Sequence, residues 1–200
     1  MVQRQPTPRV NDVAGFLLHS VAWRETSLLL EAWSREEGRV ALVAKGARRP
    51  TSALRPVLAQ FQPLSLSWAG ASEVKNLVRI EWSAPLRVYG GSAMMSAWYL
   101  NELLMRLLPR EDPHPVLYDA YDAALERLAS GGRAAGALRR FEWILLRETG
   151  YGLDLPLPDF EDAATEPALR QLLRERLALQ LNDRPLVTRQ VALALQRLRP

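Results

Sequence analysis

The sequence predicts an α+β protein in which a small β-barrel is followed by an all-helical domain. Before residue 90 the apolar residues form short runs of β type, and after it they recur at helical spacing. Glycine and proline separate these runs at the positions of turns and helix ends. We therefore predict a barrel domain over residues 1–88 and a helical domain over residues 89–200.

Five segments of the first half are typical of strands. Their lengths and the turns between them fit a five-stranded barrel, either an OB-fold or an SH3-like barrel. We expect Gly38 and Gly70 to supply the positive φ of two hairpin turns. The predicted strands are Asp12–Ser20, Thr26–Ser34, Arg39–Ala44, Leu58–Trp68 and Val74–Trp82.

Five segments of the second half have the apolar spacing of amphipathic helices. Proline at a start and glycine after an end agree with the usual asymmetry of helix ends, as at Pro115 and Gly131. The predicted helices are Ser92–Leu108, Pro115–Ser130, Ala134–Thr149, Ala164–Leu181 and Thr188–Leu198.

A run of cations without a carboxylate is the most informative local feature. The chain of 200 residues has a net charge of +4, and residues 1–90 carry a net charge of +5. Between Glu37 and Glu73 there are five basic side chains and no acidic one. Such a positive potential suits a phosphate backbone, so the sequence favours a nucleic-acid-binding protein. The five cations are Arg39, Lys45, Arg48, Arg49 and Arg55.

We expect these five cations to contact phosphates, and we expect three other cations to extend this line of positive charge across neighbouring strands. The three are Arg24, Arg35 and Lys75. Gly46–Ser52 would form a mobile loop on the binding face. Trp23 is the best candidate for an exposed aromatic that stacks a base, whereas Phe16 and Trp33 lie in apolar runs and should be buried.

The sequence offers little that could carry out catalysis. Without cysteine there is no disulfide, thiolate metal site or cysteine nucleophile. His19 and His114 lack metal-ligand spacing, and the lysine-containing phosphate loop of many nucleotide-binding proteins is absent. We therefore expect no catalytic residue, no metal and no cofactor. The start of the chain does not resemble a signal peptide and no apolar run is long enough to span a membrane, which predicts a cytoplasmic protein.

The residues also resemble a known family. Gly15–Gly70, with the combination HS, RETSLLL, GRV and AKGARRP, is similar to the N-terminal region of the bacterial recombination mediator family RecO. Tyr99–Tyr121 and Ala137–Leu155 resemble its helical region, and Arg184–Gln190 resembles its closing element. The resemblance covers most of the chain up to about residue 155, and it implies an N-terminal OB-fold followed by a helical domain.

The resemblance implies a role without a catalytic residue. Proteins of this family act in RecF-pathway DNA repair, bind single- and double-stranded DNA and anneal complementary strands. They engage the acidic tail of the single-stranded-DNA-binding protein, and they work with RecR to let RecA load, with RecF an indirect partner. The implied location is the nucleoid in the cytoplasm, with no membrane partner.

The chain departs from the family between Leu155 and Thr165, where it is short. Many members carry a longer insertion at this point, often with four cysteines that hold zinc. Because this chain has no cysteine, zinc bound by thiolates is excluded.

One helix combines cations with apolar residues in a way that suits the partner tail. An acidic peptide that ends in an apolar residue needs a cation beside a hydrophobic notch, and Arg139, Arg140 and Phe141 offer this combination. The alternative is an ordinary amphipathic helix with solvated arginines.

Two other functions also stay open for the whole chain. One is a protein-interaction scaffold whose basic loop docks an acidic partner, and the other is a metal-dependent nuclease that uses acidic residues of the helical half.

Overall fold

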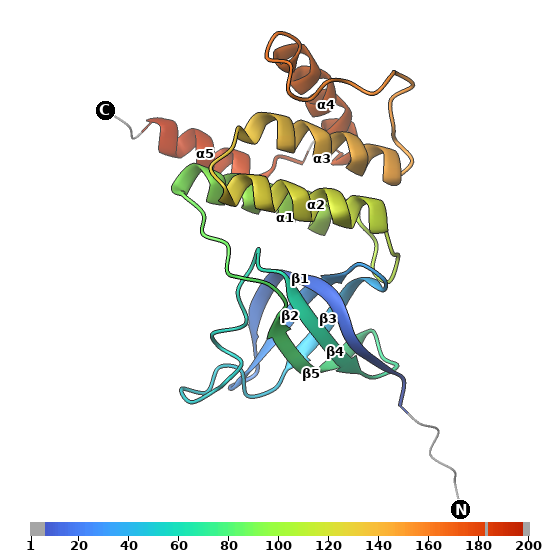
Figure 1. The fold of residues 1–200 in the computed structure, drawn as a ribbon. Helices are drawn as coiled ribbons and strands as arrows, with labels where there is room; N and C mark the ends of the chain where they lie inside the picture. Colours follow the sequence, from blue (N-terminus) through green and yellow to red (C-terminus); the bar gives the residue numbers. More distant parts are fainter. Residues whose placement is uncertain (1–6, 183, 198–200) are drawn as a thin grey trace, which may run out of the picture. The chain divides into compact units, whose positions relative to one another are not determined.

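The computed structural model describes residues 7–182 and 184–197, which form two compact units. One unit contains the five strands and also Pro109–Pro113, and the other contains Arg87–Leu108 and the chain from His114 onward (Figure 1). The predicted domain ranges also include residues 1–6, 183 and 198–200, and the last predicted helix ends at Leu198. These residues lie outside the described part of the chain.

The first unit is a closed five-stranded barrel in the order β1-β2-β3-β5-β4. Neighbouring strands are antiparallel except β3 and β5, which run parallel. This arrangement is that of an OB-fold, so the predicted fold class is confirmed and the SH3-like alternative is not. The strands are β1 (Arg9–Trp23), β2 (Ser27–Ser34), β3 (Gly38–Ala44), β4 (Leu64–Ala69) and β5 (Val74–Trp82).

Alternate residues of the strands form the core of the barrel. Leu30 of β2, Leu42 of β3 and Trp68 of β4 belong to one buried cluster. Each such side chain contributes about 1.5 to 3 kcal/mol through its burial. Phe16 and Trp33 are also fully buried, as the sequence predicted.

Both predicted hairpin glycines have a positive φ, +73° at Gly38 and +135° at Gly70. Gly38 also allows a close approach, because a Cβ atom there would lie 2.5 Å from the carbonyl oxygen of Asp112. The neighbouring Glu111 N–H donates a hydrogen bond of 2.9 Å to the carbonyl of Arg39. Pro109–Pro113 is therefore packed against the β2–β3 turn, which explains why it belongs to the barrel unit.

The strand predicted from Leu58 to Trp68 is wrong in its first half, because β4 begins only at Leu64. Residues 58–63 form turns in which Phe61 is buried with a φ of +66°. Gln60 Nε2 donates a hydrogen bond of 2.5 Å to the carbonyl of Leu18. The alternation of apolar and polar residues here belongs to a loop whose Leu58 packs against the barrel core, so it does not indicate a strand.

The second unit consists of helices, and each of the five predicted helices is present. Their described ends lie within two residues of the prediction, apart from the predicted end at Leu198, which lies outside the described residues. Leu104 of α1, Tyr121 of α2 and Phe141 of α3 are among its buried side chains. The rings of Tyr121 and Phe141 lie 6.1 Å apart. The helices are α1 (Gly91–Leu107), α2 (Pro115–Ala129), α3 (Ala134–Glu148), α4 (Glu166–Gln180) and α5 (Val187–Arg197).

Candidate nucleic-acid interface

The loop between β3 and β4, residues 45–63, is a chain of hydrogen-bonded turns. Arg49 N–H donates to the carbonyl of Gly46 at 3.1 Å, and Ser52 N–H donates to that of Arg49 at 3.0 Å. Ala47 is buried, and Leu54 packs against the barrel core. The loop that the sequence predicted to be mobile is thus tied to the end of the barrel by these contacts.

Arg48 ties this loop to the turn between β1 and β2. Its backbone N–H donates to the carbonyl of Thr26 at 2.9 Å. Its guanidinium Nη1 donates to the carbonyls of Arg24 and Glu25 at 3.1 and 3.2 Å. The turn also contains a residue in the left-handed region, because Arg24 has a φ of +54°. The two segments therefore present their cations at the same end of the barrel.

We call this group of exposed cations the basic end of the barrel. Trp23, the last residue of β1, is 43% exposed beside it, as the sequence predicted for a stacking aromatic. Glu25 contributes a carboxylate on the β1–β2 turn, and the loop from Lys45 to Arg55 has none. The members of the basic end are Arg24, Lys45, Arg48, Arg49 and Arg55.

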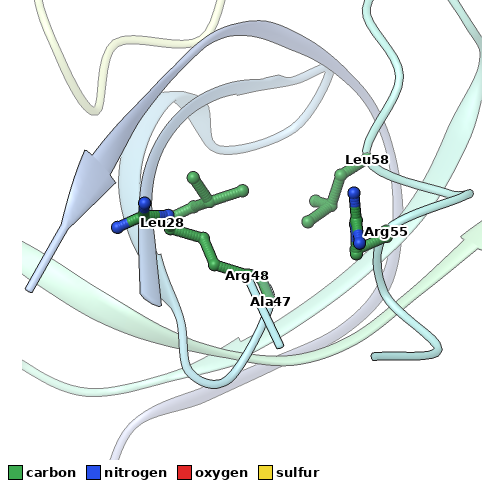
Figure 2. A pocket seen from close by; sticks show the side chains of 5 residues that line it. All are labelled: Leu28, Ala47, Arg48, Arg55 and Leu58. Atoms are coloured by element: carbon green, nitrogen blue, oxygen red, sulfur yellow. The ribbon is translucent and has the colours of Figure 1, made fainter. Parts of the chain in front are cut away.

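A hollow of about 380 Å³ opens in the basic end. Leu28 of β2 and Leu58 of the loop supply apolar walls, and Ala47 also lines the hollow. Figure 2 shows Arg48 beside Leu28 and Arg55 beside Leu58, on facing sides of the hollow. The site therefore combines an apolar interior with positive charge from two arginines.

Three of the predicted DNA-binding cations lie away from the basic end. Arg35 follows the far end of β2, where its N–H donates to the carbonyl of Ala14 at 3.1 Å. Arg39 is the second residue of β3, and its side chain is 13% exposed and lies 4.0 Å from a carboxylate oxygen of Glu31. Lys75 of β5 is 14% exposed and forms an ion pair with Glu111. The structure thus brings five of the eight predicted residues together and separates these three from them.

Arg39 belongs to a charge cluster that the sequence reasoning missed. Glu31 accepts a hydrogen bond from Arg110, whose guanidinium also pairs with Glu73. Burial lowers the pKa of Arg39, although the charge of Glu31 opposes this effect. The hydrogen bond from Arg110 to Glu31 raises the pKa of Arg110. The outer face of β2 and β3 therefore has its positive charge balanced by carboxylates.

A second cluster lies inside the helical unit. The Glu142 carboxylate accepts hydrogen bonds from Tyr99 Oη at 2.6 Å and from Arg139 Nη2 at 2.7 Å. Arg139 Nη1 is 3.9 Å from Glu166, so the cluster joins α1, α3 and α4. The sequence signal was the spacing of Arg139 and Glu142, which places opposite charges three residues apart on one helix.

The three predicted tail-binding residues on this helix differ in their exposure to solvent. Phe141 is fully buried, and Arg139 is 7% exposed with its guanidinium directed at carboxylates. Arg140 is exposed. Arg140 is thus the one of these three side chains that presents its charge on the surface of α3.

The buried Glu142 makes the stability of the protein depend on pH. Burial raises the pKa of Glu142 from its ordinary 4.5 to about 7, although Arg139 and Tyr99 favour the ionised form. The stabilising effect of proton binding to Glu142 is fully present below pH 4.5 and is lost as the pH rises through about 7. We expect urea unfolding to show a loss of about 3 kcal/mol across this window. The variant Glu142→Gln should lack this loss, and an identical pH dependence in both proteins would contradict the assignment.

Among residues 7–182 and 184–197, no three or more His, Asp or Glu side chains come together as a group that could hold a metal ion. None of the helices in this described part is long and apolar enough to cross a membrane.

The fold places this protein in the class of OB-fold proteins in which a barrel, here with a basic end, is followed by a helical unit. Sequence models described as "Recombination protein O N terminal" and "Recombination protein O C terminal" match residues 11–86 and 90–156. The chain therefore belongs to the recombination protein O (RecO) family.

Similar proteins of three bacteria are each named "DNA repair protein RecO". That of Aromatoleum aromaticum is 52% identical over 84% of this chain and 68% of its own length. That of Cupriavidus pinatubonensis is 52% identical over 76% of this chain, which spans only 53% of that relative. That of Ralstonia nicotianae is 40% identical over 95% of this chain and 86% of its own. The last match extends over 235 residues, more than this chain contains, so the relative has residues without a counterpart here.

Proposed function

We propose that this chain is a non-catalytic, DNA-binding recombination mediator in DNA repair, and that its basic end binds DNA phosphates. The observation that carries the proposal is the gathering of five exposed cations at one end of an OB-fold barrel. Membership of the RecO family and the names of its relatives support the same role.

The proposed binding is chiefly electrostatic. Each phosphate that a cation neutralises releases counterions, so affinity falls as the salt concentration rises. For a single strand, a plot of log affinity against log salt concentration has a slope of about −0.7 per phosphate contact. Because phosphates occur in every sequence, the basic end binds single and double strands without reading bases. Two strands held on one cationic surface repel each other less while their base edges stay accessible, and this favours annealing.

The test of this proposal is the salt dependence of binding to a labelled oligonucleotide, measured by fluorescence anisotropy. Five phosphate contacts give a slope of about −3.5 for a single strand. A scaffold that docks an acidic partner would show little affinity for a naked oligonucleotide at physiological salt. A nuclease would cut the strand when Mg²⁺ is added.

Partner binding forms a second part of the proposal. The chain engages the acidic tail of the single-stranded-DNA-binding protein, and it works with RecR to let RecA load, with RecF an indirect partner. These partners are inferred from the family resemblance. Because the proposed substrate is DNA, we propose that the protein acts at the nucleoid in the cytoplasm. For the tail we assign Arg140 as the surface cation, with Arg139 and Phe141 supporting α3 from within.

Replacing Arg140 by glutamine is expected to weaken binding of the tail peptide about fivefold, because one charge-assisted contact of roughly 1 kcal/mol is lost. DNA affinity should stay unchanged. Isothermal titration calorimetry with the peptide measures the effect, and Arg147→Gln, another exposed cation of α3, is the matched control. Equal peptide affinity in Arg140→Gln and wild type would move the tail site elsewhere.

A further inference from the structure

We infer that the hollow in the basic end holds one unpaired nucleobase, so that the barrel binds single-stranded DNA in preference to duplex. The inference rests on the proposed function, since it concerns how the same basic end holds its DNA. It adds a base subsite to a surface that would otherwise contact phosphates alone.

The size and lining of the hollow fit a nucleobase. Its volume is about 380 Å³, within the range of small-molecule sites. Leu28 and Leu58 offer apolar contact to the faces of a base, and both pack against the barrel core from behind. The lining contains no carboxylate that would repel the attached phosphates.

The two arginines of the hollow have complementary roles. Arg48 is held by the carbonyls of Arg24 and Glu25, so its planar guanidinium is fixed before DNA arrives. A fixed guanidinium plane can stack on a base and loses little freedom when it does so. Arg55 lies on the facing side of the hollow, where its charge can pair with a phosphate next to the inserted base.

The end of the barrel suits a DNA strand better than the outer face of β2 and β3, where OB-folds commonly bind. On that face Glu31 and Arg110 form an ion pair, and Arg39 lies beside them. At the basic end, Trp23 is exposed and gives a second surface for stacking.

The base subsite explains why a single strand should be preferred. In a duplex the base is paired and stacked, and removing it from the helix costs a few kcal/mol. A single strand avoids most of this cost, so the same phosphate contacts yield tighter binding. Insertion of one base also anchors the strand while neighbouring base edges stay accessible for pairing.

The first test compares two single strands of about a dozen nucleotides, one of thymidines and one of abasic sites with the same phosphates. We expect wild-type protein to bind the thymidine strand at least about fivefold more tightly than the abasic strand. Equal affinity for both strands would overturn the base subsite and leave the phosphate contacts intact. Failure to bind either strand would refute the proposed function itself.

A variant locates the effect in the hollow. Leu58→Asn makes one apolar wall polar without changing charge, and it should reduce the preference for thymidine over abasic strands while the abasic affinity and the salt slope stay the same. Val78→Asn, on an exposed position of β5 outside the hollow, is the matched control. An unchanged preference in Leu58→Asn, or an equal loss of preference in Val78→Asn, would contradict the assignment.

Discussion

Replacing Lys45, Arg49 and Arg55 together by glutamine is expected to weaken DNA binding about a hundredfold at moderate salt. Each cation contributes roughly 1 kcal/mol through its phosphate contact, and three contacts are lost. The salt slope for a single strand should become shallower by about 2, because three fewer counterion-releasing contacts remain. Anisotropy titrations at several salt concentrations measure both quantities.

The choice of these three residues follows from the structure. Arg48 is not substituted in this variant, because its guanidinium donates hydrogen bonds to the β1–β2 turn. Its loss would therefore disturb the site in a second way. The loop itself is held by backbone hydrogen bonds and by the apolar contacts of Leu54, which the three changes leave intact.

A matched control separates the local effect from net charge. Arg133, Arg147 and Arg174 are exposed cations of the helical unit, and their change to glutamine lowers the net charge by the same amount. This control should retain nearly the wild-type affinity and slope. Equal loss in the control and in the basic-end variant would show that total charge, and not the basic end, governs binding.

Replacing Arg139 by alanine is expected to destabilise the helical unit by about 3 to 5 kcal/mol, because it leaves the buried Glu142 without its charged partner. The variant should still contain a folded barrel, since the residues of that cluster belong to the helical unit. Urea unfolding monitored by far-ultraviolet circular dichroism measures the loss. The effect should be smaller at low pH, where Glu142 is protonated.

A double variant tests whether the loss comes from an unpaired charge. Replacing both Arg139 and Glu142 by leucine removes the two charges together, and we expect it to recover most of the stability lost in Arg139→Ala. A double variant as unstable as the single one would indicate that lost packing, and not the buried carboxylate, is responsible. Because Arg139 is buried in this cluster and Arg140 is exposed, Arg140 is the better residue for testing the partner tail.

The sequence predicted the features that depend on neighbouring residues. The bounds of β5 agree with the predicted strand, and the cations between Lys45 and Arg55 share one loop because they are close in sequence. Helical periodicity accounts for Phe141, which lies on the apolar side of α3 and is buried, while Arg140 beside it is exposed.

Features that depend on distant residues could not be predicted in this way. The sequence grouped Arg39 with the cations of the basic end, but it lies away from them beside Glu31, whose other partner Arg110 is 79 residues farther along the chain. Lys75 likewise pairs with Glu111, which comes after the first helix. The apolar wall at Leu58 was interpreted as part of a strand, because a loop whose apolar residues pack against the barrel core shows the same alternation as a strand.

The most direct test of the central claim is the annealing of two complementary labelled oligonucleotides coated with single-stranded-DNA-binding protein, measured by fluorescence energy transfer without ATP. We expect the wild-type chain to accelerate pairing and the variant with Lys45, Arg49 and Arg55 changed to glutamine to lose this acceleration. Unchanged pairing in the presence of the wild-type chain, or equal acceleration by the variant, would contradict a mediator that acts through the basic end of its barrel.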